Sequence, residues 1–392
     1  MKKMHTSLRR LAGPAVAISA AVAASNSAHG QSADALLDKL VDKGILTVEE
    51  ANDLREQSDK NFNSAYQVKS GLPDWVTSLR IGGDFRGRYE MFNSDEPTFV
   101  DRHRFRYRLR PGIVATLRDN FEVGFRLTSS EEQGSFGGDP ISGNSTFQNN
   151  SSKKYIFIDQ AYAKWTAFNN SVASGSFTIG KMENPFVFSD MVFDGDYTPE
   201  GLAQQFNLNV SEAHQVKLNL GQFAIDEIGS SNSDPYMFGA QIRLESVWNP
   251  HLATSLGLAG LMLTAEQNLS ETGTGTAVPN SNQGNTRNAN GVLASNYNPV
   301  VADGALTYTL DSFPRYNAPF PIRVTAEYMV NPAADEHNEG YAFGVTFGKS
   351  GKRGLWEVGY RWKHLEADAW YEEVVDSDFG GLTPAGTGRA NY

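Results

Sequence analysis

The chain has 392 residues, no cysteine and a formal net charge of −11. The lack of cysteine excludes disulfides, cysteine-based metal sites and thiol catalysis, and the acidic balance argues against nucleic-acid binding. The length allows one large domain and one small one.

The N-terminus has the pattern of a secretory signal peptide. Its first ten residues contain four basic side chains, Lys2, Lys3, Arg9 and Arg10. An apolar, alanine-rich run over residues 11–24 follows, and Ala28-His29-Gly30 offers small residues for cleavage. The run is too short to span a bilayer. We expect residues 1–30 to be removed, which takes the net charge from −11 to −15 because they hold four basic and no acidic residues.

Residues 31–72 are predicted to form a short helical hairpin and a linker. Leu36, Leu40 and Val41 recur at helical spacing, and Thr47-Val-Glu-Glu50 has the pattern of a capping box at the start of a second helix. A periplasmic spacer is the plainer role for this hairpin. Self-association is the alternative, although the apolar stripe is too short for a stable coiled coil by itself.

Three segments between residues 75 and 128 alternate charged and apolar side chains. From Arg102 the chain reads Arg-His-Arg-Phe-Arg-Tyr-Arg-Leu-Arg, so the arginines share one parity and the apolar residues the other. A strand points alternate side chains to opposite faces, which predicts one basic face across adjacent strands. This arginine ladder consists of Arg80, Arg86, Arg88, Arg104, Arg106, Arg108, Arg110 and Arg126.

Thirteen strands are predicted from residue 75 onward. They cover residues 75–90, 103–117, 121–132, 154–168, 173–185, 201–210, 214–226, 235–247, 252–264, 304–310, 320–330, 340–349 and 354–367. Short connections alternate with long ones at residues 91–102, 133–153, 186–200, 227–234, 265–303 and 331–339. Short turns at one end and longer loops at the other are typical of an outer-membrane barrel. The longest loop is polar and is predicted to be exposed, able to fold over the mouth of the barrel.

The strand pattern favours a membrane barrel over a soluble β domain. In a membrane barrel the apolar face meets lipid and the charged face lines a wet interior, and arginine at the lipid face would cost about 2–4 kcal/mol each. Aromatic residues collect at predicted strand ends, as interfacial rings of a barrel do: Trp75, Tyr89, Phe92, Trp165, Phe168, Trp248, Trp370 and Tyr371. In the strand over 154–168, Asp159 and Lys164 fall on opposite parities, so a bulge or an early exit from lipid is required.

Two further motifs resemble the putative porin family of Gram-negative outer membranes. Ile179-Gly-Lys-Met-Glu-Asn-Pro-Phe186 is similar to that family's strand end, and Asp194-Gly-Asp-Tyr-Thr-Pro-Glu-Gly201 is similar to the loop that follows it. The segment from Leu40 to Glu50 is similar to the helical start of those proteins. The resemblance covers nearly all of the mature chain and implies a transmembrane, antiparallel, up-and-down β-barrel of about sixteen strands.

The strand count departs from this expectation. A barrel should close with an even number of strands, whereas the thirteenth predicted strand runs outward and is followed by residues with loop composition. We therefore expect a barrel over residues 73–392 that is C-terminally incomplete, with a gap between the strands at 354–367 and 75–90. The alternative is a miscounted but complete barrel.

The ladder is the predicted functional feature. On one wall of a narrow wet channel it would bias which ions enter. An acidic loop follows the fifth strand, with Asp190, Asp194, Asp196 and Glu200. If this loop folds inward, it faces the ladder across a constriction. The alternatives are a ladder merely neutralised by Asp84, Glu90 and Glu122, and calcium binding by the loop, whose spacing does not match a helix-loop-helix calcium site.

No convincing catalytic set is present. There is no His-Glu-x-x-His pattern and no Gly-x-Ser-x-Gly elbow, and we predict neither a metal nor a cofactor. The charged run Asp335-Glu-His-Asn-Glu339 is expected to be solvated. The sequence thus predicts an outer-membrane porin for passive diffusion of small polar or anionic solutes, surrounded by outer-membrane lipid, with a homotrimer suggested by analogy alone. The rivals are a barrel enzyme of lipase or protease type, for which His103 or His364 would serve, and a secreted β-domain adhesin.

Overall fold

The fold is taken from a computed structural model, which describes residues 20–21, 72–92, 101–131, 137–229, 231–269, 284–376 and 389–391. The helical hairpin expected within residues 31–72 lies outside these ranges, as does nearly all of the predicted signal peptide. Both stay predictions.

Every one of the thirteen predicted strands has a counterpart. The strands are β2 (Val76–Phe92), β3 (Arg102–Leu117), β4 (Phe121–Ser130), β6 (Tyr155–Asn169), β7 (Ala173–Lys181), β8 (Glu200–Asn209), β9 (His214–Ala224), β10 (Tyr236–Asn249), β11 (Leu252–Leu263), β12 (Val300–Leu310), β13 (Phe320–Val330), β14 (Glu339–Gly348) and β15 (Glu357–Glu366). Shorter elements are β1 (Ala20–Ala21), β5 (Ser145–Thr146), β16 (Arg389–Asn391) and the 3-10 turns η1 (Arg118–Asn120) and η2 (Glu266–Asn268). Neither of these helical turns has the length and apolar character to cross a membrane.

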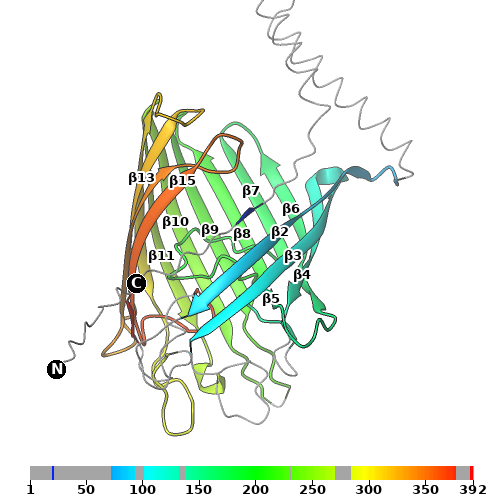
Figure 1. The fold of residues 1–392 in the computed structure, drawn as a ribbon, viewed down its shortest axis with the longest axis vertical. Helices are drawn as coiled ribbons and strands as arrows, with labels where there is room; N and C mark the ends of the chain where they lie inside the picture. The colour runs from blue at the N-terminus through cyan, green and yellow to red at the C-terminus, as the bar shows by residue number, and fades with distance from the viewer. Residues whose placement is uncertain are drawn as a thin grey trace, which may run out of the picture.

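The long strands pair antiparallel with their neighbours in chain order, and the sheet curls on itself into a barrel-like wall (Figure 1). The edge strands β2 and β15 carry the short strands β1 and β16. No strand pairing joins β2 to β15 within the part of the chain that the structure describes. The idea of a missing C-terminal part stays a prediction.

Long and short connections lie at opposite ends of the wall. The turns 170–172, 210–213 and 250–251 are short and gather at one end, whereas the connections after β7 and β11 leave from the other (Figure 1). This is the predicted alternation of short turns at one end and long loops at the other. One end of each charged strand therefore lies beside the long loops.

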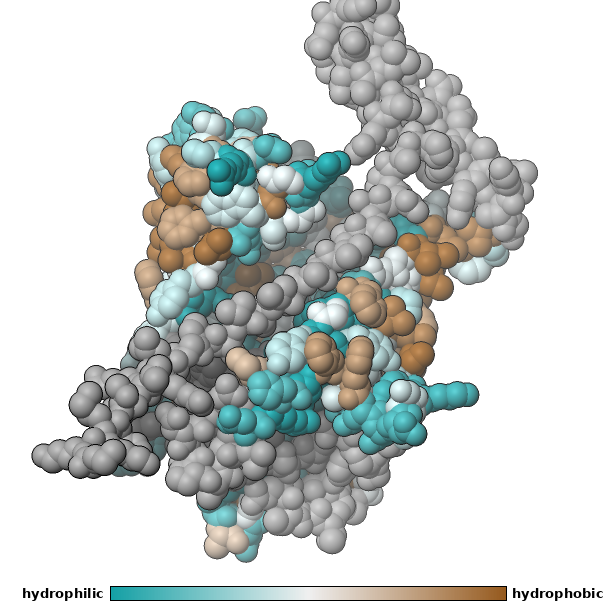
Figure 2. Space-filling model, viewed as in Figure 1, coloured by the Kyte–Doolittle hydropathy of each residue, from teal (hydrophilic) through white to brown (hydrophobic). Residues whose placement is uncertain are grey.

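The outer face of the wall is apolar, because the alternating strands turn one parity outward. On β3, Phe105 is 58% exposed while Arg106 is 8% exposed, and on β11 Leu258 is 53% exposed while Ala259 is 3% exposed. Figure 2 shows apolar surface on the flanks, with hydrophilic groups toward the two ends. The two faces predicted from the alternation are therefore confirmed.

A bulge in β6 resolves its conflicting parities. Arg126 of β4 pairs with Gln160, and the next residue, Leu127, pairs with Ile158, so Asp159 is the extra residue. An extra residue restores the phase of the side chains on either side of it. Asp159 turns inward, where it is 8% exposed and forms an ion pair with Arg126. Of the two alternatives, a bulge or an early exit from lipid, the structure shows the bulge.

Strands β3 and β4 separate toward the long loops. They pair only from Gly112 to Thr116, and beyond that point β5, which belongs to the connection between β4 and β6, takes β4's place beside β3. Ser129 links the inserted segment to the wall: its Oγ accepts from the Leu109 amide and donates to the Gly143 carbonyl, both at 2.9 Å. The segment over residues 137–147 thereby closes the space between the two strands.

The interior near the long loops is filled by a buried apolar cluster, here called the apolar plug. It includes Met182, Phe186, Met191, Val192, Phe193, Phe223, Met237, Leu261, Leu263, Leu269, Leu293, Tyr297, Val301, Met329, Trp370, Tyr371 and Val374. Two expectations are wrong here. Trp370 and Tyr371 are not interfacial, because residues 367–376 fold back inside, and the Trp370 indole donates to the Val192 carbonyl at 3.0 Å.

The second wrong expectation concerns the long loop over residues 265–303. Its described parts, 265–269 and 284–303, are not simply exposed, because Leu269 and Tyr297 are fully buried. Asn285 shows why: its amide group donates to the carbonyls of Ala367 and Trp370 at 2.6 and 2.8 Å. Hydrogen bonds from polar side chains to backbone carbonyls let a loop of polar composition pack inside the wall.

Candidate functional site: an arginine-lined interior crossed by one loop

The connection between β7 and β8, residues 182–199, runs through the interior and is here called the crossing loop. Its start is set locally: the pairing of β7 ends at Lys181, and Pro185, which lacks an amide hydrogen, disfavours its resumption. The carboxamide oxygen of Asn184 then accepts from the Phe186 amide at 3.0 Å and turns the chain inward.

The crossing loop is fixed to distant strands. Gln241 of β10 accepts from the Val187 amide at 2.9 Å and donates to its carbonyl at 2.8 Å. Glu327 of β13 accepts from the Ser189 amide at 2.9 Å. Since β10 and β13 lie on another part of the curled sheet than β3, one segment can contact all three only from within the curl.

At the far side of the interior the crossing loop meets the arginine ladder through Asp196. Its Oδ1 accepts from Arg108 and, at 3.1 Å, from Nη1 of Arg110, while its Oδ2 lies 3.7 Å from Nη2 of Arg86. Asp84 binds the same wall, with Nη2 of Arg108 at 3.1 Å and Nε of Arg110 at 2.7 Å. Three guanidinium groups therefore share two carboxylates, which leaves one positive charge in excess.

The end of the ladder nearest the long loops is bound by a buried carboxylate and covered. Glu90, buried on β2, forms ion pairs with Arg88 at 2.8 Å, with Arg106 at 3.5 Å, and with Arg104. The carbonyl of Asn144, in the inserted segment 137–147, accepts from Nη2 of Arg106 at 3.2 Å. These arginines line neither of the two cavities described below.

Glu131, just after β4, adds negative charge at this covered end. Burial raises the pKa of its carboxyl group, but the hydrogen bonds from Thr146 and the charges of Arg106 and Arg104 outweigh burial and lower the pKa below its usual value. The Thr146 amide donates to Glu131 Oε1 at 2.8 Å. The carboxylate thus helps to hold the inserted segment against the ladder.

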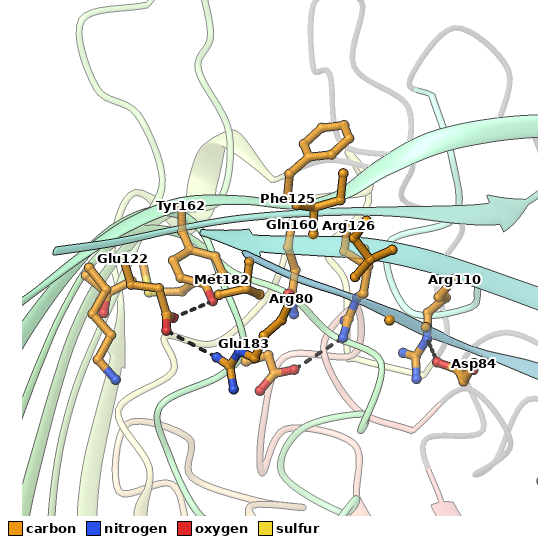
Figure 3. A pocket seen from close by; sticks show the side chains of 18 of the residues that line it. Arg80, Asp84, Arg110, Glu122, Phe125, Arg126, Gln160, Tyr162, Met182 and Glu183 are labelled. Carbon is orange, nitrogen blue, oxygen red and sulfur yellow. Dashed lines mark hydrogen bonds and ion pairs between the residues drawn. The ribbon is translucent and has the colours of Figure 1, made fainter. Parts of the chain in front are cut away.

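The other end of the ladder faces a cavity of about 560 Å³, here called the polar cavity (Figure 3). Arg80 lies 3.5 Å from Glu122, whose other oxygen accepts from the Tyr162 hydroxyl at 2.9 Å. Arg126 donates to Glu183 of the crossing loop at 3.2 Å. Figure 3 shows Glu183 between Arg80 and Arg126, so acidic and basic groups face the same space.

A second cavity of about 350 Å³ lies along the crossing loop and is here called the aromatic cavity. It shares Arg110, Arg126 and Glu183 with the polar cavity, so the two adjoin at these three residues. Its remaining lining residues are Asn184, Phe186, Phe188, Phe193, Asp194, Gly195, Tyr197 and Thr198.

The predicted acidic loop residues have different partners. Asp196 contacts the ladder, whereas Asp190 binds Lys363 at 3.0 Å and Arg361 at 2.9 Å on β15. The Asp194 carboxylate accepts from the Asp196 amide at 2.7 Å and so shapes the turn. Glu200, the first residue of β8, pairs with Lys181 at 3.1 Å.

The sequence prediction missed several residues of the site. Asp159 and Glu183 bind Arg126, and only the parity conflict in β6 pointed to Asp159. On the opposite wall, Arg243 is 2% exposed and donates to the Val187 carbonyl at 3.0 Å and to Asp303 at 2.8 Å. Nothing in the local pattern shows which arginines meet the crossing loop, because that depends on a contact between distant segments.

The histidines considered for catalysis lie elsewhere. His103 contacts the Tyr89 hydroxyl at 2.9 Å on the outer face, and His364 lies 3.7 Å from Glu366. His214 contacts Ser246 at 2.9 Å, but that serine is only 2% exposed. Among the residues that the structure describes, no three His, Asp or Glu side chains gather as a metal site would require.

Comparisons with known proteins address the family. Residues 96–264 match the family described as putative porin. A comparison with curated protein sequences finds no match. Among solved structures, the chain is similar to the outer membrane channel DcaP of Acinetobacter baumannii, with 9% identity and a TM-score of 0.40 over 75% of this chain and 93% of that chain. The matched segment spans β3 to β11, contains most of the arginine ladder and the crossing loop, and is the part of the chain that is similar to the putative porin family.

Proposed function

We propose that the protein is an outer-membrane porin, in which a water-filled passage along the arginine ladder admits small polar or anionic solutes by passive diffusion. The apolar outer face of the sheet suits lipid, and the charged inner face suits water. In this proposal residues 1–30 direct export and residues 31–72 form a periplasmic hairpin. The remaining chain forms a barrel of the kind that assembles as a homotrimer.

The contact of Asp196 with Arg86, Arg108 and Arg110 carries the proposal. It narrows the interior between a wall of fixed positive charge and a loop that brings in negative charge. Opposite charges across a narrow passage produce a transverse field, which orients polar solutes and sorts ions by sign. The excess of one guanidinium over the carboxylates at this point favours anions.

The adjoining cavities support a route past this constriction. A solute entering from the long-loop end would meet the aromatic cavity, pass Arg110, Arg126 and Glu183, and reach the polar cavity. The arginines bound by Glu90 lie off this route. The proposal therefore assigns selectivity to the Asp196 contact and to the cavity-lining Arg80, Arg110 and Arg126 rather than to the whole ladder.

Conductance of the purified full chain in a planar bilayer tests the porin function. The expected result is stepwise, voltage-tolerant ion current, together with swelling of liposomes in small neutral sugars. Absence of both from protein that shows β-sheet circular dichroism would contradict the proposal. Hydrolysis of lipid or peptide by the same preparation would instead favour the barrel enzyme.

A further inference from the structure

The aromatic cavity has two chemically different sides. One side is formed by rings of the crossing loop, including Phe188 and Tyr197, which are half-buried. The other presents the guanidinium groups of Arg110 and Arg126. A volume of about 350 Å³ lies within the range of small-molecule sites, which run from roughly 300 to 1,000 Å³.

The rings are held in place from behind. Phe193 stacks on Tyr197 with ring centres 5.7 Å apart and planes 10° apart, and it meets Phe188 at 5.8 Å. Trp370, buried in the apolar plug, contacts Phe193 edge-on at 6.1 Å. Packing of this kind fixes the aromatic surface before any solute arrives, which lowers the entropic cost of binding a flat apolar group.

The guanidinium groups keep capacity for a solute carboxylate. Arg110 uses Nε for Asp84 and Nη1 for Asp196, and its Nη2 has no hydrogen-bond partner among the residues that the structure describes. Arg126 donates through Nη1 to Glu183, whose side chain is 75% exposed. Arg126 itself is 19% exposed and also pairs with Asp159, so Glu183 is the solvent-facing member of the pair, and a solute carboxylate can take its place on Arg126.

We propose that the aromatic cavity is a binding site for aromatic monocarboxylates within the passage, an inference that rests on the proposed porin function. The carboxylate lies on Arg110 and Arg126, and the ring lies against Phe188 and Tyr197. Each arginine already has carboxylate partners, Asp84 and Asp196 for Arg110, and Asp159 and Glu183 for Arg126. A second negative charge on the solute would therefore find no cation of its own, and dicarboxylates bind less well here.

Benzoate is the probe, and its effect on potassium chloride current through the full chain is the readout. Benzoate should reduce the chloride-carried current at a concentration about tenfold lower than acetate does, because burial of one ring contributes about the free energy of a tenfold change in affinity. Benzyl alcohol, which keeps the ring and lacks the charge, and phthalate, which carries a second carboxylate, should each be weaker than benzoate.

Variants on the two sides of the cavity separate the contributions. Phe188→Ala should abolish the benzoate preference over acetate while chloride current persists, and Arg126→Gln should weaken block by both acids. Phe188→Leu keeps apolar volume without the ring and carries the test if Phe188→Ala does not fold. Phe343→Ala is the matched control, because this ring lies on the outer face and is 49% exposed. It should change neither the preference for benzoate over acetate nor the block by either acid.

The outcomes distinguish this inference from the porin function. Normal chloride current with equal block by benzoate and acetate overturns the aromatic site and leaves the porin intact. If no current is seen, the porin proposal fails, and saturation-transfer NMR of benzoate with the detergent-solubilised protein decides the site. In that experiment ring-proton signals that vanish in Phe188→Ala support the site, and absence of transfer to the original protein overturns it.

Discussion

The two sides of the interior are built on different physical principles. On the side of β2 to β4, the crossing loop is held by ion pairs between Asp196 and the arginine ladder. On the side of β9 to β15, it is held by the apolar plug and by buried hydrogen bonds to Gln241 and Glu327. Apolar packing excludes water and fixes position, whereas charge pairs beside a cavity exchange with solvent and solutes.

This difference assigns separate tasks to the two sides. The packed side determines where the crossing loop sits, and the charged side determines which solutes pass it. A loop anchored by charge alone would be displaced by salt, and a loop packed on both sides would leave no passage. The predictions below weaken one side at a time, beginning with the largest expected effect.

Removing the Trp370 ring should release the anchored side. Trp370 is 1% exposed and its indole donates to the Val192 carbonyl, so Trp370→Ala is expected to cost about 3–5 kcal/mol of stability through the cavity it leaves. Urea unfolding monitored by tryptophan fluorescence measures this cost. Single-channel current should also rise or become noisy as the crossing loop moves.

The matched control is Trp248→Ala on the outer face, where the ring is 58% exposed. Its effect on unfolding should be clearly smaller. An equal loss of stability in both variants would contradict the idea that the loop is anchored mainly by the apolar plug.

Removing the charge of Asp196 should sharpen selectivity without unfolding the protein. Asp196→Asn leaves Arg86, Arg108 and Arg110 with Asp84 alone, so anion preference should rise by up to about fivefold, the effect of one unit charge at roughly 4 Å in water. The permeability ratio for chloride over potassium gives the change. Glu200→Gln, which removes the exposed partner of Lys181, should leave the ratio nearly unchanged; a larger effect there would place the constriction elsewhere.

Raising the pH into the alkaline range should destabilise the packed side of the interior first. Changes of pH near neutrality should have little effect on it. Burial raises the pKa of Tyr371, and burial together with the nearby Asp368 charge raises that of Tyr297. Because unfolded tyrosine ionises near pH 10, these groups stabilise the fold fully below that pH and lose the contribution as pH rises above it.

Absorbance at 295 nm during an alkaline titration follows this ionisation. A late fraction of the tyrosines should ionise only together with loss of the near-ultraviolet circular dichroism signal. Complete ionisation near pH 10 with the fold intact would show that these side chains are not buried. Tyr297→Phe, which removes the hydrogen bond to Asp368, should reduce the late fraction.

The strands of the wall could be predicted from the sequence, whereas the contacts inside the wall could not. Strands were predictable because alternation is a local property, and even the bulge at Asp159 left a mark as a parity conflict. An inward path of the crossing loop could be considered from the sequence only as a condition, and the loop's anchors at Gln241, Glu327 and Trp370 depend on contacts between distant segments. For the same reason, the sequence alone could not show which arginines of the ladder are covered and which face a cavity.

The reversal potential across a salt gradient in a planar bilayer tests the central claim most directly, with Arg110→Gln compared to Arg104→Gln. Arg110 lines both cavities, and Arg104 is bound by Glu90 at the covered end of the ladder. The account predicts that the original protein prefers anions, that Arg110→Gln lowers this preference by up to about fivefold, and that Arg104→Gln changes it much less. A larger shift from Arg104→Gln, or an ohmic current without selectivity in the original protein, would contradict the account.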